Sequence, residues 1–414
     1  MFTQGFTVLS LVCVALLASQ SLPLFRKASS KPAAAEASNP HYISFRNNWL
    51  AVYLLNMMGD WLQGPYMYSL YKSYGLSVDE IAQLFVSGFL SSAIFGTVIG
   101  SLADSYGRKK VCLLFAVTYS LSCLSTLSHS FAILFLGRIL GGISTSLISS
   151  TFESWMVSEH NARGFTQQQL SDTFGYATFL NGMVAILAGM LANWAVDAYG
   201  LTGPFMLAVL DFVLASGIVY ATWGENFGSK KKKEGAIKDS KKTESALGPL
   251  LKGFSVVLKD SSILVTGLTQ SLFEGSMYTF VFMWSVALEA AAVESLPYGI
   301  IFSTFMISVV LGSQTFSLLR KNSWTPDSIL ILLLIIALGS FSLVAIFEAN
   351  QLALFWLFNL FEFSCGMYFP AMGFLRSQRV PEEVRSSVSN IFRIPLNLIV
   401  VATLLQVSTN FPLI

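Results

Sequence analysis

The sequence contains few charged residues for its length. Only 12% of its 414 residues are Asp, Glu, Lys or Arg, whereas 54% are hydrophobic. A soluble globular protein carries about 25% charged residues. The shortage of charge therefore excludes an ordinary soluble fold and predicts a polytopic membrane protein.

Cysteine and histidine are also scarce, which limits the chemistry open to the chain. The three histidines form no cluster, and no Ser/His or His/Asp constellation or phosphate-binding loop is present. The sequence therefore predicts no enzyme, no cofactor, no metal site and no nucleic-acid partner. Four cysteines lie inside apolar stretches without metal-ligand or disulfide spacing, and we interpret them as small buried hydrophobic residues: Cys13, Cys112, Cys123 and Cys365.

Long continuous apolar runs recur along the whole chain. A membrane-spanning helix needs about 20 such residues, and runs of this length favour helices over the short alternating strands of membrane barrels. The sequence therefore predicts an all-α protein. Twelve stretches are expected to span the membrane: 5–24, 47–70, 81–103, 111–128, 132–157, 174–196, 203–223, 262–288, 298–318, 329–348, 353–375 and 388–407.

Lys and Arg gather in alternate loops, and this pattern predicts the orientation. The opposite loops contain only Lys72. Cytoplasmic loops are enriched in these residues, so the basic loops are predicted to be cytoplasmic and both termini to be outside. Arg26 and Lys27 follow the span 5–24, which favours an uncleaved anchor; a cleaved signal peptide is the alternative. The basic loops hold 22 of the 25 Lys and Arg residues and are 25–46, 104–110, 158–173, 224–261, 319–328 and 376–387.

A short motif joins the third and fourth spans. Gly100 allows close helix contact, Asp104 stands at a helix end, and Gly107 permits a tight turn. The stretch from Gly100 to Lys110 resembles the signature loop of the major facilitator superfamily, G-x-L-x-D-x-x-G-R-[RK], at every defining position. The resemblance implies a transporter made of two helical bundles. It also implies a conformational latch formed by Gly100, Asp104, Gly107, Arg108 and Lys109.

Further stretches extend this resemblance over residues 1 to 412. Arg138-Ile-Leu-Gly141-Gly142 resembles the superfamily motif R-x-x-[QG]-G, and Gly312-Ser313 with Arg320-Lys321 stands where a degenerate second signature loop is expected. Three runs are similar to the molybdate-anion transporter family within the superfamily: Asp60-Trp-Leu-Gln-Gly-Pro-Tyr66, Ser271-Leu-Phe-Glu274-Gly-Ser-Met-Tyr278 and Asn390-Ile-Phe-Arg393-Ile-Pro395. This resemblance implies secondary active uptake of the molybdate oxyanion by alternating access.

The spans divide the chain into four regions. Residues 1–46 are expected to form an anchor helix and a linker, 47–223 a six-helix bundle, 224–261 a basic cytoplasmic linker, and 262–414 a second bundle. The superfamily has six helices in each bundle, whereas the second bundle shows five. We therefore expect a major facilitator fold with an extra N-terminal helix and a second bundle without its last helix.

Several spans carry polar residues at helical spacing, which places them on one helix face. Arg138 and Arg393 are single cations in apolar spans, one in each half, and a charge in hydrocarbon is expensive unless it faces protein or water. These polar residues are either structural pairs or contacts to a solute. As solute contacts we expect Arg393, Arg138, Asn56, Gln63, Gln270, Tyr278, Asn390 and Asn397. As proton-coupling residues or charge pairs we expect Asp60, Glu153, Glu274 and Glu362.

Other functions stay open at this stage. Trp61, Tyr66, Tyr278 and Trp284 could form aromatic platforms for a sugar, and another carrier could move sulfate or a drug. A non-transporting sensor or scaffold is a third possibility. For the transporter we expect molybdate and coupling protons as partners, a monomer in the lipid bilayer, and the plasma membrane rather than an internal one.

Overall fold

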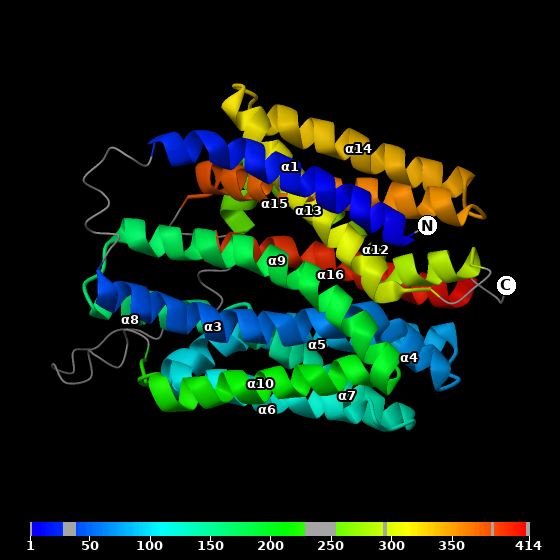
Figure 1. Cartoon of the computed structure of the whole chain (residues 1–414), viewed down its shortest axis with the longest axis horizontal. Helices are drawn as coiled ribbons and strands as arrows, with labels where there is room; N and C mark the ends of the chain where they lie inside the picture. The colour runs from blue at the N-terminus through cyan, green and yellow to red at the C-terminus, as the bar shows by residue number, and fades with distance from the viewer. Residues whose placement is uncertain (1, 28–38, 228–253, 293–295, 382–384, 411–414) are drawn as a thin grey trace.

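The computed structural model describes residues 2–27, 39–227, 254–292, 296–381 and 385–410, and within these ranges it contains helices and no strand (Figure 1). The N-terminal helix is α1 (Phe2–Lys27). The first half contains α3 (Pro40–Gln63), the 3-10 turn η1 (Gly64–Tyr66), α4 (Met67–Ser73), α5 (Val78–Tyr106), α6 (Arg108–Ser125), α7 (Phe131–Ile148), α8 (Thr151–Ala162), α9 (Gln167–Tyr199) and α10 (Gly203–Thr222). The second half contains α12 (Ser261–Ala290), α13 (Tyr298–Lys321), α14 (Pro326–Ile346), α15 (Gln351–Arg379) and α16 (Arg385–Asn410).

Local sequence explains where the helices begin and end. Ser77 and Glu80 form a capping box at the start of α5, and Thr166 and Gln169 form another at the start of α9. Gly107 separates α5 from α6 with a φ of +107°, a conformation that side chains with a Cβ rarely adopt. The signature motif therefore forms the tight helix-turn-helix that its glycine predicts.

The helices assemble into two bundles that follow the chain order (Figure 1). In the first bundle, α10 packs against α3 and α6, and α7 packs against α5 and α6. In the second, α15 packs against α12, α13 and α14, and α16 packs against α12. The described part of the second bundle contains α12 to α16, which are the five helices expected there. Most of the expected linker, residues 228–253, lies outside the described residues.

Length and composition support several membrane crossings. Seven helical stretches in the described chain are long and apolar enough to span a membrane, in α5, α7 with α8, α9, α10, α13, α14 and α15. The remaining expected spans are shorter or more polar helices, among them α3, α12 and α16, which carry many of the candidate site residues.

The helix α1 lies against the second bundle, although it begins the chain (Figure 1). Cys13 of α1 is buried with Ile307 and Leu311 of α13, and the partly buried Ile186 of α9 joins the same cluster. Near the start of α1, Gly5 lies directly on the ring of Phe355 of α15. The expected anchor is therefore also a packed part of the protein, at the edge where α9 meets α13.

One expected span is interrupted. The stretch 132–157 was expected to be a single helix, but α7 ends at Ile148 and α8 begins at Thr151. Serines at 149 and 150 occupy the break, and both hydroxyls bond back to the Ser146 carbonyl at 3.0 Å. Such bonds compete with the regular helical pattern. The expected single line from Arg138 to Glu153 therefore does not run along one straight helix.

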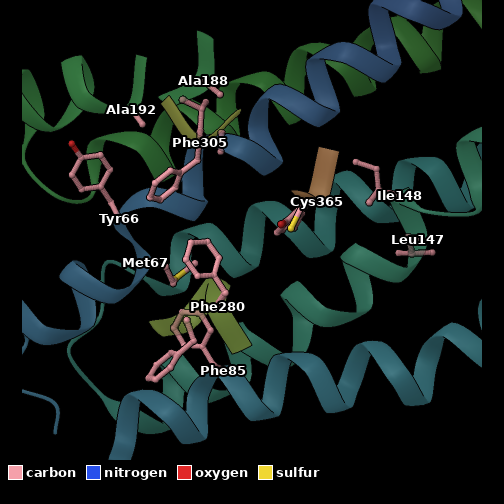
Figure 2. Packing of buried hydrophobic residues seen from close by; sticks show 14 of the residues in the cluster. Tyr66, Met67, Phe85, Leu147, Ile148, Ala188, Ala192, Phe280, Phe305 and Cys365 are labelled. Carbon is pink, nitrogen blue, oxygen red and sulfur yellow. The ribbon is translucent and has the colours of Figure 1, made fainter. Parts of the chain in front are cut away.

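A continuous hydrophobic core joins the two bundles (Figure 2). The backbones of the two bundles come close where α9 crosses α13, because a Cβ on Gly299 would lie only 2.2 Å from the Gly189 carbonyl oxygen. Ser303 of α13 also donates a hydrogen bond to the Ile186 carbonyl at 2.8 Å. The bundles also pack together where α5 contacts α16.

Candidate functional site

The polar line of α12 faces side chains from α15 in the second bundle. Tyr368 of α15 donates a hydrogen bond to the Glu274 carboxylate at 3.0 Å. Gln270, one turn before Glu274, is 3% exposed, and its amide acts on that carboxylate. The helical spacing of Gln270, Glu274 and Tyr278 thus produces a polar face that is turned into the bundle.

Arg376 is a member of this site that the sequence analysis placed in a loop. The helix α15 continues to Arg379, and Arg376 Nη1 lies 3.5 Å from Gln270 Oε1. Its positive charge also acts on Glu274. A signal was available, since Arg376 follows Glu362 by fourteen residues and so lies within about 40° of it on an ideal helix.

Arg393 brings a second positive charge to the same carboxylate. It lies on α16, its side chain is exposed, and its charge acts on both Glu274 and Tyr278 of α12. Asn397, one turn further, is half-buried. Asn390 lies on α16 as well, but its side chain is outside the described residues. We call Gln270, Glu274, Tyr368, Arg376 and Arg393 the arginine–glutamate cluster.

Glu362 is a buried acid on α15. Its exposed fraction is 8%, and within the described residues its carboxyl group forms no hydrogen bond or ion pair. Its neighbour Asn359 is satisfied by Ser308 at 2.8 Å and by the Phe355 carbonyl at 2.8 Å. A buried carboxyl without partners is costly when ionised, so Glu362 remains a candidate proton carrier.

The first bundle has its own acid and arginine. Tyr119 of α6 donates a hydrogen bond to the Asp60 carboxylate of α3. Arg138 of α7 donates from Nε to the Leu84 carbonyl at 3.4 Å, and its guanidinium lies 4.9 Å from the centre of the Phe85 ring. These contacts direct Arg138 onto α5.

Near Arg138, aromatic rings from the two bundles pack against one another. Phe85, which contacts Arg138, packs against Phe282 of α12 with ring centres 5.1 Å apart. Phe89 of α5 packs against Tyr278 of α12 at 5.6 Å. Within the described chain, no contact joins Arg138 directly to the arginine–glutamate cluster. The sequence predicts both Arg138 and Arg393 as solute contacts. In the described structure Arg138 contacts α5, whereas the charges of Arg393 and Arg376 both act on Glu274.

The remaining expected residues of the first bundle differ in their surroundings. Asn56 and Gln63 are buried, and each donates an amide hydrogen bond to the carbonyl four residues earlier on α3. The Asn56 Oδ1 atom is buried without a hydrogen-bond partner in the described structure. Glu153 is exposed on α8, and its charge acts on Tyr53 together with that of Asp60.

The signature loop is tied to neighbouring helices. Arg108 forms an ion pair with Asp104 at 2.7 Å and donates a hydrogen bond to the Ser154 carbonyl of α8 at 3.1 Å. The Glu225 carboxylate, just after α10, accepts hydrogen bonds from the backbone N–H of Lys109 and of Lys110 at 2.8 and 3.3 Å. Gly100 lies within α5. The loop thus joins α5, α6, α8 and the end of α10.

At the end of the molecule opposite the signature loop, an ion pair and hydrogen bonds join the two bundles. Lys72 of α4 forms an ion pair with Glu289 of α12 at 2.9 Å. The Tyr66 hydroxyl donates to Asn193 Oδ1 at 2.9 Å and accepts from the Gly299 backbone N–H at 3.3 Å. A cavity of about 930 Å³ borders these residues. We call this group the Lys72-side closure.

Solved structures of transporters have the same fold. The chain aligns with the POT family transporter PepTSo at a TM-score of 0.68 and 12% identity, over 89% of this chain and 90% of that one. It aligns with a D-xylose–proton symporter at a TM-score of 0.64 and 16% identity, over 89% and 90% of the two chains. With two bundles, a signature loop and buried polar helix faces, this is a multi-pass membrane protein of the major facilitator fold.

Sequence comparisons narrow the class to a family. Residues 2–353 match the family model described as sugar transporters with 12 transmembrane segments. The molybdate-anion transporter of Xenopus tropicalis is 35% identical over 94% of this chain and 85% of its own length. That of Danio rerio is 34% identical, over 95% and 85% of the two chains. The chain therefore belongs to the major facilitator family that includes the vertebrate molybdate-anion transporters, a family of transporters rather than enzymes.

Proposed function

We propose that this protein carries molybdate across a membrane by alternating access. The observation that supports this function best is the similarity to several vertebrate molybdate-anion transporters along nearly the whole chain. The arginine–glutamate cluster gives the proposal a site, because it places two guanidinium groups beside donors from Gln270 and Tyr368.

The chemistry of the cluster suits a tetrahedral oxyanion. A guanidinium group presents a planar fork of N–H donors that matches pairs of oxygens, and hydrogen bonds to an ionised acceptor are stronger than neutral ones. We propose Arg376 and Arg393 as the main ligands, with Gln270, Tyr278 and Asn397 as further polar groups. Arg138, Asn56 and Gln63 lie in the other bundle, where they would meet the anion only in another stage of the cycle.

Charge makes coupling to cations necessary for uphill uptake. Molybdate is a dianion, and each elementary charge moved against 100 mV costs about 2.3 kcal/mol, so entry into a negative interior costs about 4.6 kcal/mol. We propose protons as the coupling ions. Asp60, Glu274 and Glu362 are the candidate carriers, since each is an acid within a bundle that forms no ion pair in the described chain.

The placement of charge supports one orientation in the membrane. The signature loop belongs to the basic side, which we assign to the cytoplasm, and the Lys72-side closure is then on the outside. We further propose that the protein acts as a monomer in the plasma membrane, which surface labelling of intact cells and its mass in detergent would test.

A sugar is the alternative cargo, favoured by the description of the matching family model. The aromatic residues that could serve it are largely engaged elsewhere. The Trp61 indole donates to Asn181 at 3.0 Å, Trp284 is 5% exposed, and Tyr66 belongs to the Lys72-side closure. Only Tyr278 remains beside the cluster.

Uptake by purified protein in lipid vesicles tests the proposal. With an inward proton gradient, radioactive molybdate should accumulate above its external concentration, tungstate should compete, and glucose should not. Vesicles without protein and vesicles with a collapsed gradient are the controls. Accumulation of glucose, or no flux of molybdate at all, would contradict the proposed function.

A further inference from the structure

The hydrogen-bond donors and positive charges around Glu274 are also the groups that would bind an oxyanion. Its carboxylate accepts a hydrogen bond from Tyr368, lies near the amide of Gln270, and is subject to the positive charges of Arg376 and Arg393. A carboxylate resembles part of a tetrahedral oxyanion, since both present ionised oxygens to such donors. The protein thus contains an internal anion at the position proposed for the substrate.

The carboxylate is close to both arginines but is not paired with either. Among the ion pairs of the described chain, none within 4 Å joins Glu274 to an arginine, whereas Arg379 on the same helix pairs with Asp327. Arg376 instead makes a long contact of 3.5 Å with Gln270. Because the guanidinium groups of Arg376 and Arg393 form no ion pair with the Glu274 carboxylate, they have N–H donors left for a second anion.

Both helices that carry the arginines contain a proline near them. Pro370 lies six residues before Arg376 in α15, and Pro395 lies two residues after Arg393 in α16. A proline inside a helix removes a backbone hydrogen bond and allows a bend. Before Pro370, α15 packs closely on α13, because a Cβ on Gly366 would lie 2.0 Å from the Val309 carbonyl of α13. A bend at Pro370 would therefore move the arginine-bearing end of α15 relative to the part that is packed on α13.

We propose that Glu274 is an internal competitor of the transported oxyanion, and that the anion binds to Arg376 and Arg393 by displacing the Glu274 carboxylate. This inference rests on the proposed function and extends it by naming the residues that bind the anion and the carboxylate that the anion displaces. Like charges repel, so an ionised Glu274 weakens anion binding even though it belongs to the site. Removing the carboxylate and removing an arginine should consequently change affinity in opposite directions.

Equilibrium binding of molybdate to purified full-length protein in detergent, measured by calorimetry, tests this. Glu274→Gln keeps the shape of the side chain and should bind molybdate about tenfold more tightly, which corresponds to about 1.4 kcal/mol. Arg376→Gln should bind at least tenfold more weakly, and Arg376→Lys should recover only part of the loss, because lysine lacks the fork. Arg379→Gln, three residues away on the same helix, is the matched control and should bind as the wild type does.

The outcomes separate this inference from the proposed function. Unchanged or weaker binding by Glu274→Gln would overturn the inference, and so would wild-type affinity in Arg376→Gln. If the Glu274→Gln gain appears with sulfate while molybdate binds to neither protein, the inference stands and the molybdate proposal falls. If neither protein binds molybdate, tungstate or sulfate, both are wrong. Thermal unfolding of each variant shows whether a loss of binding reflects a loss of folding.

Discussion

At the scale of single residues, each bundle contains an acid that accepts a hydrogen bond from a tyrosine on another helix. Tyr119 donates to Asp60 in the first bundle, and Tyr368 donates to Glu274 in the second. In both cases the acid lies on the first helix of its bundle, α3 or α12. The repetition suggests that both acids serve the transport cycle rather than local packing alone.

The Asp60 carboxyl group is expected to matter for coupling. Asp60→Asn should reduce uphill, gradient-driven molybdate uptake at least tenfold, because an amide cannot carry a proton, while exchange of labelled for unlabelled molybdate continues. Both fluxes can be measured in the same vesicles. Tyr119→Phe, which retains the carboxyl group, is the control. Undiminished accumulation by Asp60→Asn would exclude this residue as the carrier.

Glu225 is expected to stabilise the start of α6. Its carboxylate accepts two hydrogen bonds from backbone N–H groups at the positive end of that helix. Glu225→Ala should lower the free energy of unfolding by about 1 to 2 kcal/mol, as loss of a helix cap does. Thermal unfolding in detergent measures this, with Glu159→Ala as a control that removes only a surface ion pair to Arg163. Equal stability of Glu225→Ala and the wild type would refute the cap.

The candidate site could be predicted from sequence only in part. Helical spacing was enough to place Gln270, Glu274 and Tyr278 on one face, because that depends on a single helix. Partners on other helices, such as Tyr368, depend on how helices rotate against one another, which no local pattern records. Arg376 was missed for a different reason, since hydropathy marks the end of the apolar run and not the end of the helix.

At the scale of helices, close glycine contacts fix where the bundles meet. Gly189 of α9 and Gly299 of α13 allow the two backbones to touch, and the Tyr66 hydroxyl bonds to the Gly299 N–H beside them. Without this approach, the Lys72-side closure would lose its support. The same principle acts inside the second bundle, where Gly312 and Gly366 join α13 to α15.

A methyl group at this crossing should disturb the transport cycle. Gly299→Ala places a Cβ about 2.2 Å from the Gly189 carbonyl oxygen, so the helices must separate. Molybdate uptake should fall severalfold while the protein remains folded, which uptake and thermal unfolding together would show. Gly339→Ala, whose Cβ would meet open space, is the control. Full activity of Gly299→Ala would mean that the tight crossing is not required.

The helices themselves could largely be predicted from the sequence. Apolar runs of spanning length predicted two bundles and an extra N-terminal helix, because each run in lipid must form its own backbone hydrogen bonds. The interruption between α7 and α8 was not foreseen, since serines in an apolar run carry no strong breaking signal. The position of α1 against α13 was also not predictable, because its contacts involve residues about 300 positions away in the chain.

At the scale of the whole molecule, Lys72 and Glu289 form an ion pair that joins the two bundles in the described chain. Both side chains are half-exposed, at 52% and 31%, and such pairs contribute about 0–1 kcal/mol. An effect of this size is small for folding. It is large enough, however, to shift the balance between two conformations of similar energy.

Reversing the charge at position 72 should make the Lys72-side closure open more often. The four native cysteines are buried, so a cysteine introduced by Val196→Cys, which lines the cavity but does not belong to the closure, can report access to a soluble thiol reagent. In that background Lys72→Glu should speed labelling severalfold, and the exchange Lys72→Glu with Glu289→Lys should restore the original rate. Equal rates in all three proteins would show that the ion pair does not influence opening.

The central claim is that an oxyanion binds between α12, α15 and α16. Anomalous X-ray scattering from molybdenum, in crystals of the protein grown with molybdate, locates the metal without assumptions about its ligands. We expect a single strong peak within hydrogen-bonding reach of the Arg376 and Arg393 guanidinium groups, with the Glu274 carboxylate moved away. A peak beside Arg138 or in the cavity near Lys72, with none at Arg376, would contradict it.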